Sequence, residues 1–329
     1  MQTRALTILS AAASLALICA ATAGPATAKV PGPNGRIAYS LALPAGGTLV
    51  YTAAPDGSDP RQVPLPYLNE DWGRAVWSPN GSHLLLSNIL RFDANGDLLP
   101  FRPGIVGPDG SDFRLLEVPG NPFDAFCAGW SPDGARIVCG LGLDQPGLFS
   151  LRAADGGDPI RLTSSPPGYS DAPGDYSPDG SQFVFIRFND GAARNRGQDR
   201  DNQAALFITG ADGTGQRQLT PYGYVRAHEQ AAVAWSPDGS TILSSTRDGR
   251  LFTIHPDGSG LTPIRLQIGT GDYFAYGAGY SPDGTRIVFT LNAGGPSDIY
   301  SANLDGSAAQ RLTTDPAPAR LPDWGPAST

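Results

Sequence analysis

A short turn motif repeats along the sequence, and it constrains the fold more than any other feature. The motif is an aromatic residue followed by Ser-Pro-Asp-Gly, or by Ser-Pro-Asn-Gly in the first copy. Its copies begin at Trp77, Trp130, Tyr176, Trp235 and Tyr280. A shorter version, Pro-Asp-Trp-Gly-Pro, occupies residues 322–326. The copies are spaced roughly 45–60 residues apart, a period typical of chains built from equal structural units.

The unit at residues 275–313 shows the expected anatomy. Its first strand, A, ends at Tyr280, and the motif then turns the chain, because Pro282 presets φ and Gly284 accepts a left-handed conformation. The other expected strands are 285–290 (strand B), 298–303 (strand C) and 309–313 (strand D). Strands joined by such short turns pair as an antiparallel meander.

Strand B is apolar at consecutive positions rather than at alternate ones. The runs are Leu84-Leu85-Leu86, Ile137-Val138, Phe183-Val184-Phe185 and Ile287-Val288-Phe289. A sheet with one wet face alternates apolar and polar residues, so these runs predict sheets buried on both faces. A propeller blade, packed between two neighbours, has this property. A two-sheet sandwich is the alternative, and six nearly equal meanders argue against it.

The two ends of the sequence complement each other. Asn34-Gly35 and a strand at 36–40 have no aromatic motif before them, whereas residues 322–326 form a motif with no strand B after it. We therefore predict a first blade that is split between both ends, which closes the ring and removes free sheet edges. Ile37 lies two residues after Gly35, whereas in the last unit the spacing is three, so this junction is expected to differ.

The predicted fold is all-β, a six-bladed β-propeller of four-stranded antiparallel blades whose ring is closed by the split first blade. The 42 glycines and 31 prolines, with no long apolar period of a helix, agree with this class. One propeller domain is expected at 31–326, followed by a tail at 327–329. The predicted blades are 322–326 with 34–64, 75–119, 126–166, 174–221, 232–267 and 277–313.

The repeated motif and its strands resemble the TolB-type propeller repeat, also called the WD40-like PD40 repeat. Five near-complete copies carry the resemblance, which covers nearly all of residues 31–326. It implies a TolB-like propeller domain. TolB also has an N-terminal α/β domain, for which the sequence leaves no room before Arg36, so the resemblance does not imply a role in the Tol–Pal system. No α/β-hydrolase domain, as in the similar propellers of prolyl oligopeptidases, is expected either.

The first residues are typical of a secretory signal peptide. Arg4 precedes an apolar run at 5–21, and small residues allow cleavage after Ala23 or Ala28. We therefore predict a signal peptide at 1–28 and a secreted or periplasmic protein with no membrane span in the mature chain. Retention of the apolar run as a membrane anchor is the alternative.

Two cysteines remain after this cleavage, Cys127 and Cys139. They flank the turn at 131–134, so the pairing of strands A and B brings them nearly opposite each other. Exported chains commonly join such pairs, and we predict a Cys127–Cys139 disulfide. The net charge of −8 argues against nucleic acid as a partner, because phosphate backbones require a basic face.

The blade connections fall on two faces with different sequence character. The A–B and C–D connections share one face and are nearly all Asn-Gly or Asp-Gly turns, including one expected at Asn34-Gly35. The B–C and D–A connections share the other face, vary in length and carry aromatic and acidic residues, as functional loops on rigid scaffolds do. Plugging of the ring by these aromatics is the alternative. The candidate ligand-binding residues are Tyr67, Glu70, Asp71, Trp72, Phe123, Asp124, Tyr169, Asp171, Tyr222, Tyr224, His228, Glu229, Asp272, Tyr273 and Tyr276.

The sequence offers little for catalysis or metal binding. The three histidines are His83, His228 and His255, which are spread over both faces and do not make a zinc site. No Gly-x-Ser-x-Gly motif occurs. The segment 93–97 begins like a calcium loop, but Leu98 stands where such a loop needs glycine. We therefore predict no catalytic residue, no metal and no cofactor.

The sequence favours an exported, non-catalytic, monomeric propeller that binds a protein or a glycan through its D–A and B–C loops. Two alternatives stay open. One is a propeller enzyme acting at the channel mouth, either a glycan lyase or hydrolase or a peptidase-like enzyme, since paired carboxylates support glycosidic chemistry. The other is a structural module without a ligand. Among the candidates, Trp72, Tyr224 and Tyr273 are preferred as anchors, because each belongs to a different blade junction.

Overall fold

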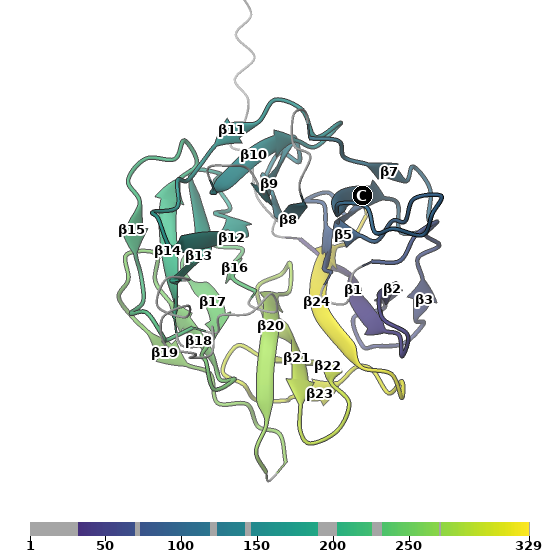
Figure 1. Ribbon diagram of the computed structural model, residues 1–329. Helices are drawn as coiled ribbons and strands as arrows, with labels where there is room; N and C mark the ends of the chain where they lie inside the picture. Colours follow the sequence, from purple (N-terminus) through teal and green to yellow (C-terminus); the bar gives the residue numbers. More distant parts are fainter. Residues whose placement is uncertain are drawn as a thin grey trace, which may run out of the picture.

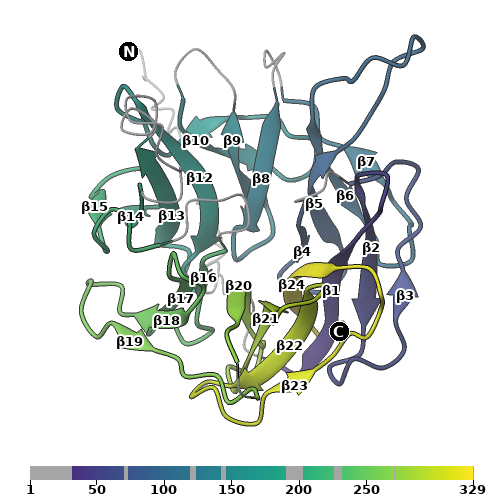
Figure 2. The same ribbon diagram turned by 60° about the horizontal axis from the view of Figure 1, so that its bottom comes forward.

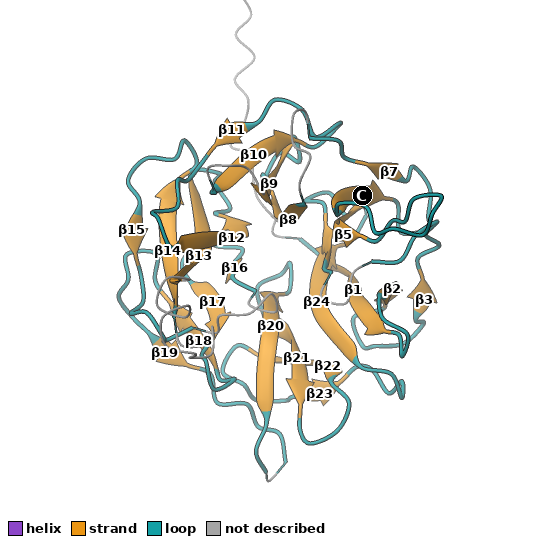
Figure 3. Ribbon diagram, in the orientation of Figure 1, coloured by secondary structure: helices purple, strands orange, loops and turns teal. Residues whose placement is uncertain are grey.

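The described residues form a closed ring of β-sheets. The computed structural model describes residues 32–69, 73–118, 124–141, 146–189, 203–225, 232–269 and 271–328. These residues form 24 strands and no helix. The strands make six four-stranded sheets, arranged as blades around a central axis (Figures 1 and 3). The predicted six-bladed propeller is therefore confirmed.

Each blade is an antiparallel meander whose strand A lies nearest the axis (Figure 1). Blade 1 contains β24 (Ala319–Pro326), β1 (Asn34–Ala42), β2 (Thr48–Ala53) and β3 (Arg61–Gln62). Blade 2 contains β4 (Ala75–Trp77), β5 (Leu84–Ile89), β6 (Arg102–Val106) and β7 (Arg114–Leu115). Blade 3 contains β8 (Ala125–Trp130), β9 (Arg136–Leu141), β10 (Leu148–Arg152) and β11 (Ile160–Arg161).

The second half of the ring repeats this order. Blade 4 contains β12 (Tyr169–Tyr176), β13 (Gln182–Asn189), β14 (Ala204–Gly210) and β15 (Arg217–Gln218). Blade 5 contains β16 (Ala234–Trp235), β17 (Ile242–Ser245), β18 (Leu251–Ile254) and β19 (Thr262–Pro263). Blade 6 contains β20 (Phe274–Tyr280), β21 (Arg286–Asn292), β22 (Asp298–Asn303) and β23 (Gln310–Arg311).

Blade 1 joins the two ends of the described chain, as predicted. Strand β24 pairs with β1, and Trp324 lies opposite Ile37. The indole N–H of Trp324 donates a hydrogen bond to the Gly35 carbonyl at 3.1 Å. Figure 2 shows the yellow C-terminal strand beside the purple first strand. The ring is thus closed by hydrogen bonds between strands far apart in the sequence.

The predicted turn at Asn34-Gly35 was wrong. Asn34 is the first residue of β1 and lies opposite Pro326. The register shifts between Asn34 and Ile37, which accounts for the spacing that differs from other blades. A Cβ atom on Gly35 would lie only 2.2 Å from the Pro326 carbonyl oxygen, so a glycine is needed for this close approach.

The A–B turns of blades 2 to 6 and the C–D turns of all six blades are those that the sequence predicts. The A–B glycines, with φ between 68° and 73°, are Gly81, Gly134, Gly180, Gly239 and Gly284. The C–D glycines, with φ between 78° and 86°, are Gly57, Gly110, Gly156, Gly213, Gly258 and Gly306. A Cβ on Gly134 would lie 3.8 Å from Pro79 of the preceding blade. Successive turns therefore stack into a ring on one face.

The core lies between blades rather than inside one of them. One buried layer joins Val76 and Leu85 of blade 2 to Trp130 and Ile137 of blade 3. Another joins Trp324 of blade 1 to Val288 and Ile299 of blade 6. Because each sheet is covered on both faces, the consecutive apolar residues of strand B are all buried, as predicted.

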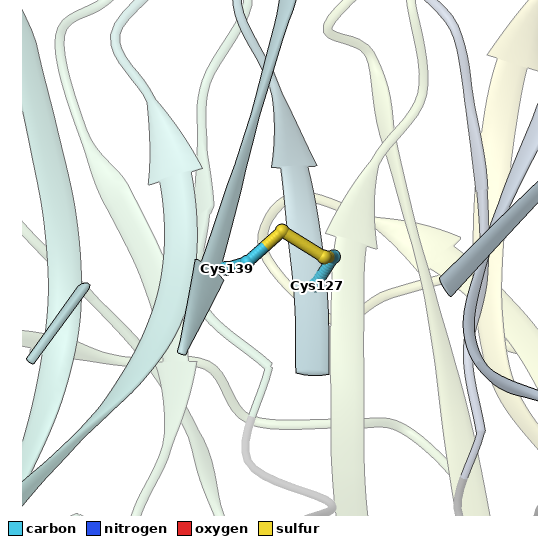
Figure 4. The surroundings of a disulfide bond; sticks show 2 residues. All are labelled: Cys127 and Cys139. Carbon is cyan, nitrogen blue, oxygen red and sulfur yellow. A yellow bond between two sulfur atoms is a disulfide. The ribbon is translucent and has the colours of Figure 1, made fainter. Parts of the chain in front are cut away.

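The predicted disulfide is present. Cys127 in β8 lies directly opposite Cys139 in β9, and the two sulfur atoms are bonded (Figure 4). Both residues are fully buried in the layer between blades 2 and 3. The bridge therefore reinforces the innermost strand pair of blade 3.

Candidate functional site

The two ends of the ring have different chemical character. We call the end that carries the A–B and C–D turns the turn face, and the end that carries the B–C and D–A connections the loop face. Of the fifteen candidate residues, the structure describes nine, which all belong to loop-face segments or to the strand ends next to them. The other six lie outside the described residues: Glu70, Asp71, Trp72, Phe123, His228 and Glu229.

Three candidates, Tyr169, Tyr222 and Asp171, come together on blade 4. The rings of Tyr169 and Tyr222 lie with centroids 5.9 Å apart, and Tyr222 lies 6.1 Å from Phe207. The Arg187 guanidinium sits over the Phe207 ring at 4.9 Å. Both tyrosines are partly exposed. Burial, with a smaller contribution from Tyr169, raises the pKa of the Tyr222 phenol.

Asp171 is not an open carboxylate. Its side chain is fully buried and accepts hydrogen bonds from Arg187 Nε at 2.6 Å and Arg187 Nη2 at 2.8 Å. It also accepts a hydrogen bond from Thr163 Oγ1 at 2.7 Å. The carboxylate therefore fixes Arg187 beneath the aromatic rings, and its negative charge is matched locally.

Two further candidates, Tyr224 and Tyr273, pack their rings against neighbours from blade 5, one apolar and one cationic. Tyr224 packs edge-on against Phe252, with centroids 5.1 Å apart, and burial raises the pKa of its phenol. The Arg250 guanidinium lies 4.1 Å from the centroid of the Tyr273 ring. Both tyrosines keep part of their surface in solvent. These rings are held in place before any ligand arrives.

The remaining candidates differ in exposure. Asp272 is exposed, whereas Tyr276 is only 5 % exposed and belongs to the blade interior. Asp124 is exposed and accepts a hydrogen bond from the Phe101 backbone N–H at 2.8 Å, which joins a D–A loop to a B–C loop. Tyr67 is 42 % exposed, lies 6.0 Å from Phe113 and lines a small hollow of about 150 Å³.

Charged residues around the channel were missed by the sequence analysis. The Trp77 backbone N–H donates to Asp323 Oδ2 at 2.8 Å, and the Trp235 N–H donates to Asp175 Oδ2 at 3.2 Å. Arg74, just before β4, is 9 % exposed. Burial lowers the pKa of its guanidinium, and the carboxylates of Asp323 and Asp175 oppose this shift. A charged residue stands directly before the motif aromatic at Asp175 and Asp323, and this pattern could have identified them from the sequence.

Within the described ranges, no three His, Cys, Asp or Glu side chains gather as metal ligands. Those ranges also contain no helix long and apolar enough to cross a membrane.

Comparisons with known proteins agree with the geometry. A family model for the WD domain, G-beta repeat, matches residues 220–252. A Tol-Pal system protein TolB of Anaeromyxobacter dehalogenans (strain 2CP-C) is 40% identical over 94 residues, which are 28% of this chain and 20% of that protein. The match thus spans only a fifth of the relative's length.

Solved structures share the fold over most of the chain. TolB from Acinetobacter baumannii has a TM-score of 0.61 at 18% identity and is matched over 89% of this chain and 67% of its own. An oligogalacturonate lyase in complex with manganese has a TM-score of 0.50 at 16% identity, over 86% of this chain and 74% of its own. With its six four-stranded blades and repeated Ser-Pro-Asp-Gly turns, the chain is a TolB-like β-propeller with WD40-like repeats.

Proposed function

We propose that the chain acts outside the cytoplasm as a non-catalytic propeller that binds a partner protein through its loop face. The observation that carries this proposal is a set of partly exposed aromatic rings already held in place. They are Tyr169, Tyr222, Tyr224 and Tyr273. Such rings offer flat apolar contact area and lose little side-chain freedom on binding.

The packing behind the rings supports a preorganised surface. Arg187 is anchored by the buried carboxylate of Asp171, and the guanidinium also contacts the ring of Phe207. The Arg250 guanidinium contacts the ring of Tyr273. Exposed carboxylates at Asp124 and Asp272 favour a neutral or cationic ligand over an anionic one.

A protein is favoured over a glycan because the rings are distributed over blades 4, 5 and 6. A ligand that touches all of them must cover a broad surface, and stable protein interfaces bury about 800 Å² on each partner. The relative's name as a protein of the Tol-Pal system points in the same direction. The close pair Tyr169–Tyr222 favours a second candidate, a glycan that stacks one sugar on these rings.

Export is supported by the buried disulfide. A disulfide persists in oxidising compartments and is rare where thiols are kept reduced. The signal peptide expected at residues 1–28 is the second support, and it stays a prediction.

The proposal is tested by screening the purified protein on peptide and glycan arrays, and then measuring affinity of the hit for variants. Tyr224→Ala and Tyr273→Ala are each expected to weaken binding by about tenfold or more, because central aromatic anchors dominate interface energy. Asp212→Ala and Asp257→Ala serve as controls on the turn face, where both carboxylates only cap their own turns. Loss of affinity in the controls, with full affinity in the folded tyrosine variants, would show that the ligand binds to the turn face and would refute the proposal.

A further inference from the structure

The turn face contains a pocket of ligand size between blades 2 and 3. Its volume is about 520 Å³, within the range of small-molecule sites. The A–B turn of blade 2 forms one wall, and the turn and strand ends of blade 3 form the other. The side chains that line it and matter below are His83, Arg114, Trp130, Asp133 and Arg152. None of these belongs to the loop face described above.

At the position of His83, blades 1, 3 and 6 carry an arginine, whereas blades 4 and 5 carry Gln182 and Thr241. Arg36 of blade 1 spans from strand B to the C–D turn and pairs with Asp59 at 3.0 Å. Arg136 of blade 3 does the same with Asp158 at 2.9 Å. Blade 2 has His83 at this position, and its ring is too short to span the gap. Its Nδ1 bonds instead with the neighbouring Ser82 hydroxyl at 2.7 Å.

The C–D turn of blade 2 keeps the geometry of the other two. Asp112 has a φ of 54°, beside 52° for both Asp59 and Asp158. Asp59 and Asp158 each bind the arginine of their own blade. Among the described residues, no ion pair is formed by Asp112. The Asp112 carboxylate is therefore left without the arginine that Asp59 and Asp158 bind in their own blades.

Two arginines line the pocket, although the chain carries a net charge of −8. Arg114 contributes a guanidinium whose Nε is buried and has no hydrogen-bond partner. Arg152 contributes a second guanidinium, which Asp155 holds at 2.8 Å. Among the described residues Arg114 forms no ion pair, so its charge is open to an anionic ligand in the pocket.

The acid in the pocket does not cancel this charge by contact. Asp133 Oδ1 accepts hydrogen bonds from Ser131 Oγ at 2.6 Å and from the Ala135 backbone N–H at 3.0 Å. The carboxylate is thus directed at its own turn. The apolar part of the lining comes from the indole of Trp130 and from Pro79 and Pro132.

We propose that this pocket binds an organic anion, with a carboxylate or phosphate group on Arg114 and a flat apolar body against Trp130 and the two prolines. A guanidinium is planar and matches either anion with paired hydrogen bonds. Arg152 lines the opposite wall, where Asp155 already pairs with its guanidinium. This site is independent of the loop face. It binds an anionic ligand, whereas the exposed carboxylates of the loop face disfavour one.

The test uses fluorine NMR on the full chain with para-fluorobenzoate and para-fluorophenyl phosphate as probes. The neutral para-fluorobenzamide, of the same shape as the benzoate, is the matched control ligand. Saturable binding of at least one anion, with at least about tenfold weaker binding of the amide, is expected. The tighter anion identifies the ligand class. Equal binding of benzoate and benzamide, or no binding of either anion, would overturn the proposal.

Three variants locate the site. Arg114→Gln is expected to weaken anion binding by about tenfold or more, which corresponds to ~1.4 kcal/mol or more. Arg61→Gln is the matched control, because Arg61 begins strand D of blade 1 as Arg114 begins strand D of blade 2, and it lies outside the pocket. Its affinity should stay within about twofold of the parent chain.

The third variant, Ala154→Trp, fills the pocket from an exposed position without changing charge. It is expected to abolish anion binding while thermal unfolding stays near that of the parent, so it remains informative if Arg114→Gln folds poorly. Unchanged affinity in both pocket variants would refute the assignment. The loop-face proposal does not depend on either result, since its ligands and variants are different.

Discussion

The closure of the ring by β24 makes a strong prediction about Trp324→Ala. The Trp324 side chain is 2 % exposed and packs with residues of both blade 1 and blade 6. Its indole N–H donates a hydrogen bond to the Gly35 carbonyl oxygen at 3.1 Å. The substitution therefore removes a large part of the packing between the C-terminal strand and the rest of the ring.

The expected loss of stability follows from two contributions. Replacing a buried tryptophan with alanine costs ~3–5 kcal/mol through lost burial and the cavity left behind. The Gly35 carbonyl loses its donor, which adds about 1 kcal/mol. The sum of ~4–6 kcal/mol is a large share of the 5–15 kcal/mol typical of a folded domain. With a urea dependence of about 3 kcal/mol per M, the midpoint should fall by ~1.3–2 M.

Urea unfolding followed by circular dichroism measures this shift. Phe92→Ala is the control, because its ring is 62 % exposed and its loss should cost under about 0.5 kcal/mol. The Trp324 variant should still unfold in one transition, only at lower urea. A midpoint that stays within about 0.3 M of the parent would mean that β24 frays without opening the ring, and the reasoning on closure would fail.

The other predictions concern the disulfide, a buried ion pair and a buried phenol. Replacing Cys127 and Cys139 together by alanine should lower the free energy of unfolding by ~3 kcal/mol, measured in urea, since their sequence separation is 12; no difference from the parent under oxidising conditions would contradict a role for the bridge. Arg187→Met leaves the fully buried Asp171 carboxylate without its partner and should cost ~3–5 kcal/mol by the same assay, whereas a stable variant would show that water replaces the guanidinium. Burial raises the pKa of Tyr280 to about 12, so its neutral form stabilises the fold below pH 10 and this contribution is lost as the pH rises to about 12; Tyr280→Phe should reduce the loss of stability between pH 9 and 12 by ~2–3 kcal/mol, and an equally steep loss in the variant would contradict the assignment.

Local sequence rules predicted the blades well because each blade repeats the same turns. Glycine at the fifth motif position accounts for the A–B turns, and the unpaired motif at 322–326 indicated the split blade. The turn expected at Asn34-Gly35 was wrong because the partner strand comes from the other end of the chain, which a local motif does not reveal. The sequence therefore predicted the turns between consecutive strands better than the pairing of strands from the two ends of the chain.

The candidate sites were harder to predict because exposure depends on packing between blades. Tyr273 lies just before β20 and Tyr276 lies within this strand, and the first is partly exposed whereas the second is buried. Asp171 pairs with Arg187, whose place within an apolar run of β13 was a signal of a buried partner. The pocket beside His83 lies between blades 2 and 3, so it shows only when neighbouring blades are placed in space.

The split blade also determines the order in which the chain can fold. Trp324 and Gly35 meet across a separation of 289 residues, so blade 1 stays incomplete until residue 326 has been synthesised. Contacts this far apart form late, because closing a long loop carries an entropic cost before any contact is gained. Blades 2 to 6 can form hairpins earlier, but blade 1 is completed only when β24 pairs with β1. A growing or translocating chain is therefore held in an open form, and the closed ring appears only in one late step.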